Sequence, residues 1–361
     1  MANKLRALGI MNGTSLDAID YALIEADLSL SHLRFIGHKQ KKMPLALRKR
    51  LLQAAKNQAT AYDVSLLHYD LGRLYAKQIR ELKKYFSFDI VGLHGQTVHH
   101  QGGRASLQIG HPAFLKEACN KPIYFDFRAA DIAVGGQGAP FAPFLHKVIS
   151  HNMKQPVAFH NLGGISNLTY LNGSCCLAFD TGPANILLDA WIQEKKGLAF
   201  DKRGQLSAQG LPDPHLVNNF LQHPFFKKKA PKSTGREDFN LDFIKKWGGR
   251  KFNRLSLENQ MASLAELTAL SIQKAYRQLP LLPDSIYFYG GGVENNYLMS
   301  RLAFHLPLTK FKSTLELGWP PQAMEASAFA LLALARHVNV QVHLPEVTGA
   351  KKRQHLGSLY S

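Results

Sequence analysis

The sequence predicts an α/β protein made of two related halves, because one β-hairpin design occurs twice. In each hairpin an apolar run, a polar turn that contains glycine and a second apolar run follow one another: residues 5–11, 12–15 and 21–24, and again residues 157–160, 161–167 and 168–171. Such a turn presents a concave set of backbone N–H donors, which suits a phosphate group. Two of them predict two similar half-domains that hold a nucleotide-type ligand between them.

The rest of the chain alternates between helical and strand-like spacing of apolar residues, which is the pattern of an α/β fold. This spacing predicts helices at 45–55, 62–85, 185–191, 255–279, 296–304 and 325–338, and strands at 90–93, 123–127, 176–179 and 285–289. The most glycine-dense segment, residues 134–140, is expected to be a hinge or crossover between domains, or a surface loop. We place one domain over residues 1–133 and about 339–361, and the other over residues 134–338.

Length and charge restrict the possible functions. The 361 residues suit about two domains, and 44 Lys and Arg against 26 Asp and Glu give a net charge of +18. This charge favours nucleic acid, phosphate ligands or anionic membrane surfaces as partners. The basic residues are spread over several patches, however, and accompany no helix-turn-helix, aromatic-interleaved RNA motif or zinc finger. We therefore expect a solvated basic surface and no nucleic-acid partner.

The sequence shows neither a membrane span nor a signal peptide. The longest apolar stretch near the C-terminus, residues 326–335, is about half of the roughly 20 residues that cross a bilayer. The three cysteines, Cys119, Cys175 and Cys176, form no CxxC pair. We therefore expect a reduced, cytoplasmic protein without a structural zinc site and without a membrane partner.

The first hairpin turn is a candidate phosphate-binding loop. Gly13 lets the backbone approach an oxyanion closely, and the hydroxyls of Thr14 and Ser15 can donate hydrogen bonds. Asp17 and Asp20 follow the turn, and a carboxylate beside a phosphate loop often holds Mg²⁺ through water. The alternative for Asp17 is an aspartate that only stabilises the turn.

Two further glycine segments follow predicted strands. The second hairpin turn, residues 161–167, is either a second phosphate clamp or an ordinary glycine-rich turn. Residues 290–292 are three consecutive glycines between a strand and a helix, so their N–H groups and the helix dipole can face an anion or let an adenine lie on the backbone. Their spacing is not GxGxxG, which argues against a Rossmann dinucleotide site.

Asp180 is the candidate general base. It ends an apolar strand, and Pro183 stands where the first turn of a helix would begin. A helix N-terminus favours the ionised carboxylate, and a base must be ionised when substrate arrives. The alternative is an aspartate that only caps the helix.

Three other polar positions lie beside predicted elements. The strand at 90–93 runs into residues 94–97, a predicted polar turn at the carboxyl end of the strand, where open α/β sheets place ligands. The strand at 123–127 delivers Arg128. Glu325 enters an otherwise apolar helix, either as a functional carboxylate or as a plain partner of the helix dipole.

A series of ordered segments runs along the chain: residues 9–17, 94–97, 126–140, 161–167, 179–183, 231–237 and 290–292. Together they resemble the anhydro-N-acetylmuramic acid kinase family of bacterial cell-wall recycling enzymes. The resemblance implies an actin/hexokinase-type fold, with two RNase-H-like domains closing over ATP and sugar. It also implies that ATP and water turn 1,6-anhydro-N-acetylmuramic acid into N-acetylmuramic acid 6-phosphate and ADP, and it suggests a homodimer. In that reaction Asp180 would deprotonate the water that attacks the anomeric carbon, while the freed O6 takes the γ-phosphoryl group.

The same resemblance implies the binding residues. For ATP these are Gly13, Thr14, Ser15, Leu16, Asp17, Ala18, Ile19, Asp20, Asn161, Gly163, Gly164, Gly290, Gly291 and Gly292, with Mg²⁺ held through water near Asp17. For the sugar they are Gln96, Thr97, Arg128 and Glu325, the forked guanidinium of Arg128 suiting a lactyl carboxylate. Ala18 and Ala184 stand where the family usually has glycine, and the stretch before Glu325 lacks an expected aspartate.

Two other functions remain open at this point. One is an ordinary sugar kinase on the same fold, which phosphorylates an existing hydroxyl and needs no attack by water. The other is a non-enzymatic sugar-sensing regulator that would use the basic surface on DNA.

Overall fold

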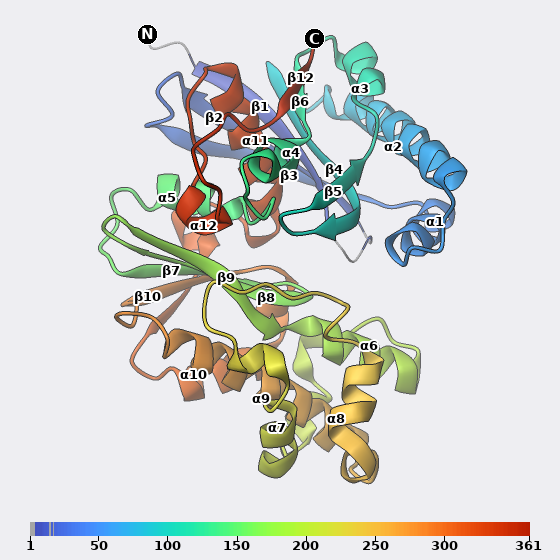
Figure 1. Cartoon of the computed structure of the whole chain (residues 1–361), viewed down its shortest axis with the longest axis vertical. Coiled ribbons are helices and arrows are strands. Elements are labelled where there is room, and N and C mark those ends of the chain that lie inside the picture. The colour runs from blue at the N-terminus through green and yellow to red at the C-terminus, as the bar shows by residue number, and fades with distance from the viewer. Residues whose placement is uncertain (1–3, 14–15, 17) are drawn as a thin grey trace. The chain divides into compact units, whose positions relative to one another are not determined.

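The chain divides into two compact units. The computed structural model describes residues 4–13, 16 and 18–361. The first unit comprises Met1–His151 and Gln322–Ser361, and the second comprises Asn152–Pro321 (Figure 1). These limits differ from the predicted boundaries, because residues 134–151 and 322–338 both fall in the first unit.

The first unit is built on a seven-stranded sheet in the order β12-β6-β4-β1-β2-β3, with β5 paired to β4. The strands are β1 Lys4–Asn12, β2 Ala18–Asp27, β3 Leu33–Lys42, β4 Ile90–Gln101, β5 Ala105–Ile109, β6 Ile123–Phe125 and β12 Ser358–Tyr360. The first three strands form an antiparallel meander, and β4 and β6 then add to β1 in parallel.

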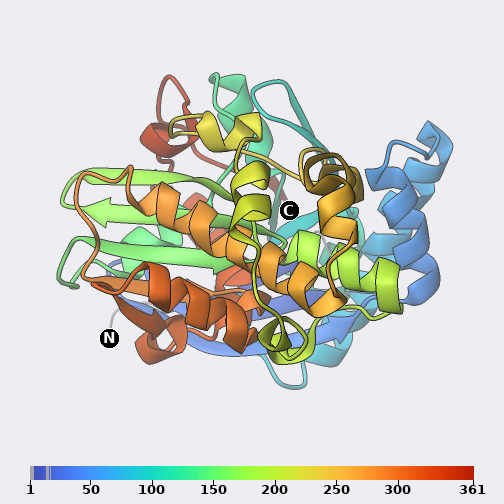
Figure 2. The ribbon, with the colours of Figure 1, turned by 90° about the horizontal axis from the view of Figure 1, so that it is seen from below.

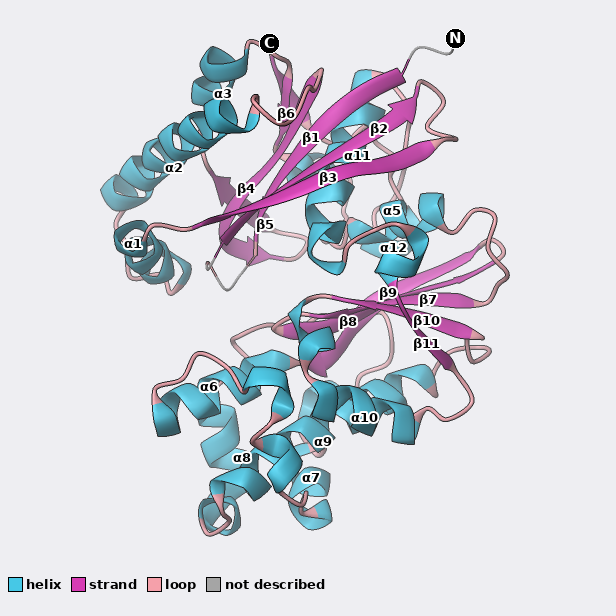
Figure 3. Ribbon diagram, turned by 180° about the vertical axis from the view of Figure 1, so that it is seen from behind, coloured by secondary structure: helices cyan, strands magenta, loops and turns pink. Residues whose placement is uncertain are grey.

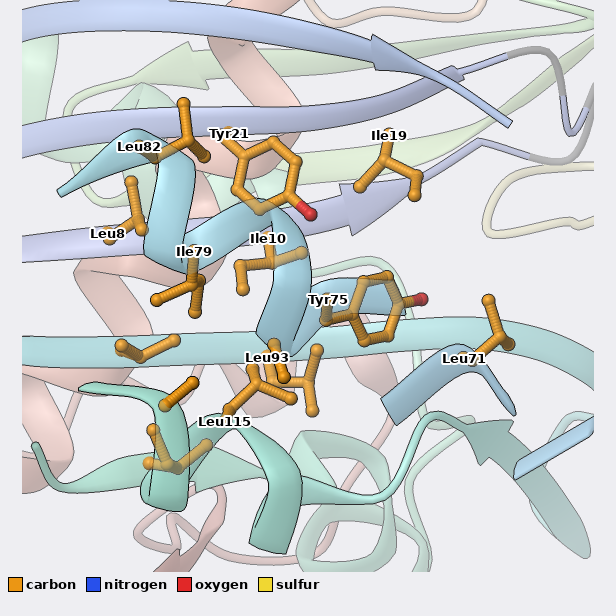
Figure 4. Packing of buried hydrophobic residues seen from close by; sticks show 14 of the residues in the cluster. Leu8, Ile10, Ile19, Tyr21, Leu71, Tyr75, Ile79, Leu82, Leu93 and Leu115 are labelled. Carbon is orange, nitrogen blue, oxygen red and sulfur yellow. The ribbon is translucent and has the colours of Figure 1, made fainter. Parts of the chain in front are cut away.

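Helices cover both faces of this sheet (Figure 3). They are α1 Leu45–Ala55, α2 Ala61–Leu82, α3 Pro112–Cys119, α4 Phe127–Ala133, α5 Ala142–Ile149, α11 Met324–His337 and α12 Pro345–Thr348. On one face, Ile10 and Tyr21 of the sheet pack in a fully buried cluster with Leu71 and Tyr75 of α2 (Figure 4). Burial of such side chains is the main source of the unit's stability.

Helix α11 lies directly on the strands β1 and β4. A Cβ atom at Gly9 would stand 1.9 Å from the carbonyl oxygen of Ala326, and one at Gly92 would stand 2.3 Å from that of Phe329. Only glycine therefore permits this close approach of backbone to backbone. The contact draws α11 and the residues before it into the first unit and fixes Glu325, in the first turn of the helix, beside the sheet.

The second unit repeats the strand order of the first. Its strands are β7 Val157–Leu162, β8 Ile165–Asn172, β9 Cys175–Pro183, β10 Ser285–Tyr289 and β11 Lys310–Ser313, in the order β11-β10-β7-β8-β9. Again three antiparallel strands come first, and two strands then add in parallel to the first of them. This order, 3-2-1-4-5 in each unit, is that of an RNase-H-like domain, so the predicted α/β fold with an internal duplication is confirmed.

Five helices accompany the second sheet: α6 Asn185–Lys196, α7 Pro214–Phe220, α8 Leu241–Asn253, α9 Leu257–Tyr276 and α10 Asn296–His305. Helix α9 is the central one, because it packs on β9 and also on α6, α7 and α10 (Figure 2). Its C-terminal half, with Ile272 and Tyr276, joins the apolar face of the sheet. Its N-terminal half, with Met261 and Leu264, joins an aromatic cluster that includes Trp191 and Phe220.

The apolar spacing located most elements correctly, and α1 and β10 have the predicted limits. Three polar segments were placed wrongly. The second hairpin turn is limited to Gly163 and Gly164, because Asn161 pairs with Asn167 and Leu162 pairs with Ser166, which makes the rest of 161–167 part of β7 and β8. Residues 94–97 form no turn but lie within β4, because β5 pairs with them, with Gln96 opposite Ile109. Similarly, β9 continues beyond Asp180 to Pro183, because β8 pairs with it to that point.

The glycine-dense segment at 134–140 lies inside the first unit rather than between the units. Gly138 N donates to Asp131 Oδ2 at 2.6 Å, and Gln137 N donates to the carbonyl of Thr348 at 2.8 Å. His343 Nε2 contacts the other oxygen of Asp131, and both side chains are fully buried. The segment is thereby tied to α12. Among the helices of the described residues, none has both the length and the apolar character needed to cross a membrane.

Candidate functional site

Asp180 lies on β9, the edge strand of the second sheet, opposite Asn167 of β8. The backbone of residues 232–234 runs along this edge. Asp180 N donates to the carbonyl oxygen of Lys232 at 2.9 Å, and Thr234 N donates to Asp180 Oδ2 at 2.9 Å. The carboxylate is thus held from the side of the strand that has no strand partner.

Burial raises the pKa of Asp180 to about 7, and the negative charge of Glu237 acts in the same direction. The amide of Thr234 and the charge of Lys232 lower it by less than burial raises it. A carboxyl group that titrates near neutral pH can take up a proton during a reaction and release it afterwards.

The predicted reason for an ionised Asp180, a helix N-terminus, is wrong. Helix α6 begins at Asn185, and its first amides are already satisfied within the unit. The N–H groups of Ala184 and Ile186 donate to the carbonyl of Gly164, and that of Asn185 donates to the carbonyl of Gly163. The environment of Asp180 therefore favours the neutral acid, the opposite of what a helix N-terminus would do.

A buried polar network fixes the strands next to Asp180. Thr181 Oγ1 donates to Ser166 Oγ at 2.6 Å, and the same hydroxyl is 2.6 Å from His160 Nε2. His160 Nδ1 is 3.0 Å from the hydroxyl of Tyr276 on α9. Burial lowers the pKa of His160 to about 3, so the ring is neutral. The network joins β7, β8, β9 and α9 behind the base.

The glycines of the second unit fall into two kinds. Gly290 has a φ of 85°, and a Cβ atom there would stand 2.3 Å from Asn161 Oδ1. A Cβ atom at Gly292 would stand 2.7 Å from Leu162 Cβ, so the fold itself requires glycine at both positions. At Gly164 the nearest atom would be 3.9 Å away, and at Gly291 no described atom lies within 4 Å. Neither Gly164 nor Gly291 has a left-handed φ, so neither the packing nor the backbone conformation requires glycine at these two positions.

Arg128 and His94 form a fixed pair in the first unit. Arg128 Nη2 is 3.0 Å from His94 Nε2, and His94 Nδ1 is 2.9 Å from the carbonyl oxygen of Gly95. Burial and the charge of Arg128 hold the pKa of His94 far below its usual value. The neutral ring therefore donates through Nδ1 and accepts from Arg128 through Nε2. It also packs on Phe329 of α11, with ring centroids 4.3 Å apart.

The Arg128 guanidinium and the Glu325 carboxyl influence each other in this unit. Burial lowers the pKa of Arg128 to about 10, and Glu325 partly opposes this. Burial and the charge of Asp20 raise the pKa of Glu325, while Arg128 lowers it. Arg128 Nε and Gln96 Oε1 are buried without a hydrogen-bond partner among the described residues. Buried groups of this kind usually have a partner, so the Arg128 N–H suits an anionic group and the Gln96 oxygen suits a hydrogen-bond donor such as a hydroxyl.

A family model described as anhydro-N-acetylmuramic acid kinase matches residues 5–361. The chain belongs to this family. It is 41% identical to the anhydro-N-acetylmuramic acid kinase of Idiomarina loihiensis, and the alignment covers 98% of each chain. With the same coverage, it is 38% identical to the kinase of that name from Pseudomonas syringae pv. tomato and 36% identical to the one from Gloeobacter violaceus. Membership in this kinase family makes the chain a phosphotransferase.

The first hairpin turn, which this family resemblance singled out, is only partly described. Thr14, Ser15 and Asp17 lie outside the described residues. Leu16 N donates to the carbonyl oxygen of Gly13 at 3.2 Å. The side chain of Leu16 is 1% exposed, within the core of the first unit. The side chain of Leu16 therefore serves the core rather than a ligand.

The first residues of β2 are likewise held within the first unit. Ile19 is fully buried in the core, and Ala18 pairs with Lys42 of β3. Asp20 presents its carboxylate to two side chains of β3. Its Oδ1 accepts from Gln40 Nε2 at 3.1 Å and is 2.8 Å from His38 Nε2.

The structure brings three of the predicted residues of the first unit together, since the charges of Asp20 and Arg128 both act on the pKa of Glu325. Thr97 is farther along β4, and its hydroxyl accepts from Gln108 Nε2 at 3.1 Å. In the second unit, Asn161 lies against Gly290.

Sequence reasoning missed two features of the site. One is His94, which holds Arg128, and the other is the segment 232–238, which contacts Asp180. The only signal for the segment was its place in the family resemblance as a polar run between apolar stretches.

Proposed function

We propose that this chain uses ATP and water to convert 1,6-anhydro-N-acetylmuramic acid into N-acetylmuramic acid 6-phosphate and ADP. The observation that carries the proposal is Asp180, a half-buried carboxyl group whose pKa of about 7 suits a general base, in a chain of this kinase family. The relatives' shared name supplies the substrate.

The proposed reaction needs one carboxylate, which acts in its first step. Asp180 takes a proton from water and releases it to solvent after turnover, the oxygen of that water bonds to the anomeric carbon, and the bond from that carbon to O6 breaks. The freed O6 bonds to the γ-phosphorus, and the bond from phosphorus to ADP breaks. Opening the anhydro bridge thus supplies the nucleophile for phosphoryl transfer.

The first unit supplies the groups for the sugar. The two parallel N–H donors of Arg128 match the lactyl carboxylate, and His94 fixes the plane of the guanidinium. Glu325, whose pKa is raised, can exchange hydrogen bonds with sugar hydroxyls. Gln96 adds a buried carbonyl oxygen that can accept one of them.

For the nucleotide we propose backbone contacts at Gly164 and Gly291, where a Cβ atom would meet no close neighbour. Mg²⁺ is expected to accompany the ATP phosphates. A divalent cation beside Asp20 would relieve the repulsion by which that carboxylate raises the pKa of Glu325. Within the described residues no three His, Cys, Asp or Glu side chains gather as ligands, so phosphates and water would complete its shell. The homodimer and the cytoplasmic location stay predictions.

The test is a coupled assay of ADP release with the anhydro sugar, run in H₂¹⁸O. We expect ADP release only when the anhydro sugar is present, and ¹⁸O at the anomeric position of the product after a single turnover, before exchange. Phosphorylation without label would instead indicate an ordinary hydroxyl kinase. Absence of ADP release with any anhydro-muramyl sugar would overturn the proposal.

A further inference from the structure

Residues 232–238, called here the 232–238 loop, contact Asp180 in two ways. The carbonyl of Lys232 accepts from Asp180 N, as a neighbouring strand would, and Thr234 N donates to Asp180 Oδ2. The first contact fixes the backbone of β9 at the base. The second engages one carboxylate oxygen, which directs an incoming proton to the other.

The loop is itself held firmly. Thr234 Oγ1 donates to Asp238 Oδ2 at 2.7 Å, and Phe239 N donates to the carbonyl of Gly235 at 3.2 Å. Phe239 is fully buried, with its ring centroid 5.1 Å from that of Phe243 on α8. A Cβ atom at Gly235 would stand 2.4 Å from Glu237 Oε2, so glycine lets that carboxylate fold back over the loop.

The loop also places two opposite charges near the base. Glu237 raises the pKa of Asp180, and Lys232 lowers it. Lys232 Nζ lies 4.4 Å from the ring centroid of Phe225, and burial lowers its own pKa to about 8. Lys228 and, from α9, Lys274 face Lys232 and act in the same direction.

The elements packed behind the base contribute no charge of this kind. His160 and Tyr276 are the titratable groups of the buried network on that side, which reaches Asp180 through Ser166 and Thr181, and burial raises the pKa of Tyr276 so that it stays neutral. The His160 ring is neutral at physiological pH, because burial lowers its pKa to about 3. Control of the base therefore comes from the loop side.

We propose that the 232–238 loop orients the Asp180 carboxylate and sets the pH range in which it acts as a base, with Lys232 and Glu237 as opposing controls. The inference rests on the proposed role of Asp180. Lys232 and Glu237 are positioning residues, because they act through Asp180 rather than on the reacting atoms. This role gives a function to the 232–238 loop, which the proposed reaction does not use.

The first test compares pH profiles of kcat/KM. In the wild type we expect activity to rise with pH about a midpoint near 7. Glu237→Gln should move the midpoint to lower pH and Lys232→Gln to higher pH, each by roughly half a unit. The double variant should return near the wild-type midpoint. Glu194→Gln and Lys196→Gln, exposed on α6, make the same charge changes as controls and should leave it in place.

The second test needs no substrate. The carboxyl carbons of aspartate are labelled with ¹³C, the Asp180 signal is assigned from its loss in Asp180→Asn, and its titration midpoint is compared among the same variants. Opposite shifts in the two loop variants support the inference. Equal midpoints, or a loss of activity that is uniform over pH, would overturn it. Full turnover by Asp180→Asn would instead exclude Asp180 as the base. Because the titration needs no activity, it separates that failure from a failure of the loop to control the pKa of Asp180.

Discussion

The two units share one strand order, and each holds a carboxyl group whose pKa is raised by burial and by a second carboxylate and lowered by a cation. In the first unit Arg128 and Glu325 each oppose the effect of burial on the other's pKa. In the second unit Lys232 opposes burial in the same way, but burial and Glu237 outweigh it at Asp180, whose pKa reaches about 7. Arg128, with a pKa of about 10, stays charged at neutral pH, which suits the binding of an anionic group. Asp180 changes its state near neutral pH, which suits proton transfer.

The largest effect is expected from removing the titrating group. Asp180→Asn should lower kcat by about 10³-fold, within the range that general-base catalysis contributes. Binding of ATP should persist, since the amide keeps the shape of the side chain and can still accept from Thr234 N. Single-turnover kinetics and equilibrium ATP binding check the two parts. Turnover near the wild-type rate would exclude Asp180 as the base.

The stability of Asp180→Asn tests the raised pKa of Asp180 independently of activity. The pKa of Asp180 is raised in the folded state, so its contribution to stability is complete below the unfolded-state pKa and is lost as pH rises through about 7. The Asn variant lacks this loss. Its Tm should therefore fall less than the wild-type Tm between pH 6 and pH 8, and a parallel fall would contradict the raised pKa.

The next effect is expected in the first unit. Arg128→Met should raise the KM for the sugar by about 10²-fold, because a charge-assisted hydrogen bond contributes roughly 1.5–3 kcal/mol. Arg128→Lys should recover little of it, since an ammonium cannot replace the planar fork that His94 holds.

The effect of Arg128 should differ from that of Asp180 in its pH dependence. The pKa of Arg128 is about 10, so its charge is constant from pH 6 to pH 8. The ratio of variant to wild-type KM should therefore be flat over that range, whereas the Asp180 effect is not. A ratio that varies about pH 7, or an unchanged KM, would place Arg128 outside the sugar site.

The repeated hairpin predicted the duplicated sheet because the apolar pattern of each strand is visible within a few residues of sequence. Helix α1 and strand β10 were located for the same reason. The surroundings of Asp180 were not, because β9 continues past it only through pairing with β8. Local sequence places Pro183 at a helix start, but the ladder of hydrogen bonds to a neighbouring strand prevails over that local preference.

The same distinction applies to the site. Asp180, Arg128 and Glu325 were named from the sequence because they stand next to predicted elements. His94 holds Arg128 across a separation of 34 residues, and Thr234 contacts Asp180 across 54. Such contacts depend on the tertiary fold. The raised pKa of Asp180 likewise follows from burial, which no neighbouring residue in the sequence reports.

The smallest effect is expected at the glycines of the second unit, which separate folding from binding. Gly164→Ala and Gly291→Ala should fold normally, since a Cβ atom has room at both positions and neither has a left-handed φ. Reduced freedom of the unfolded chain should even stabilise them, by about 0.4–1 kcal/mol. If ATP lies against these backbones, the KM for ATP should nevertheless rise about tenfold, the cost of roughly 1.4 kcal/mol of lost contact.

Gly290→Ala is the matched control, because it should do the reverse. A Cβ atom there would stand 2.3 Å from Asn161 Oδ1 at a φ of 85°, so the variant should lose at least about 1 kcal/mol of stability. Chemical denaturation and ATP kinetics on the three variants give the two readouts. A wild-type KM for ATP in Gly164→Ala, at full stability, would remove the second hairpin turn from the nucleotide site. A raised KM there without loss of stability would mean that this glycine serves the ligand rather than the fold.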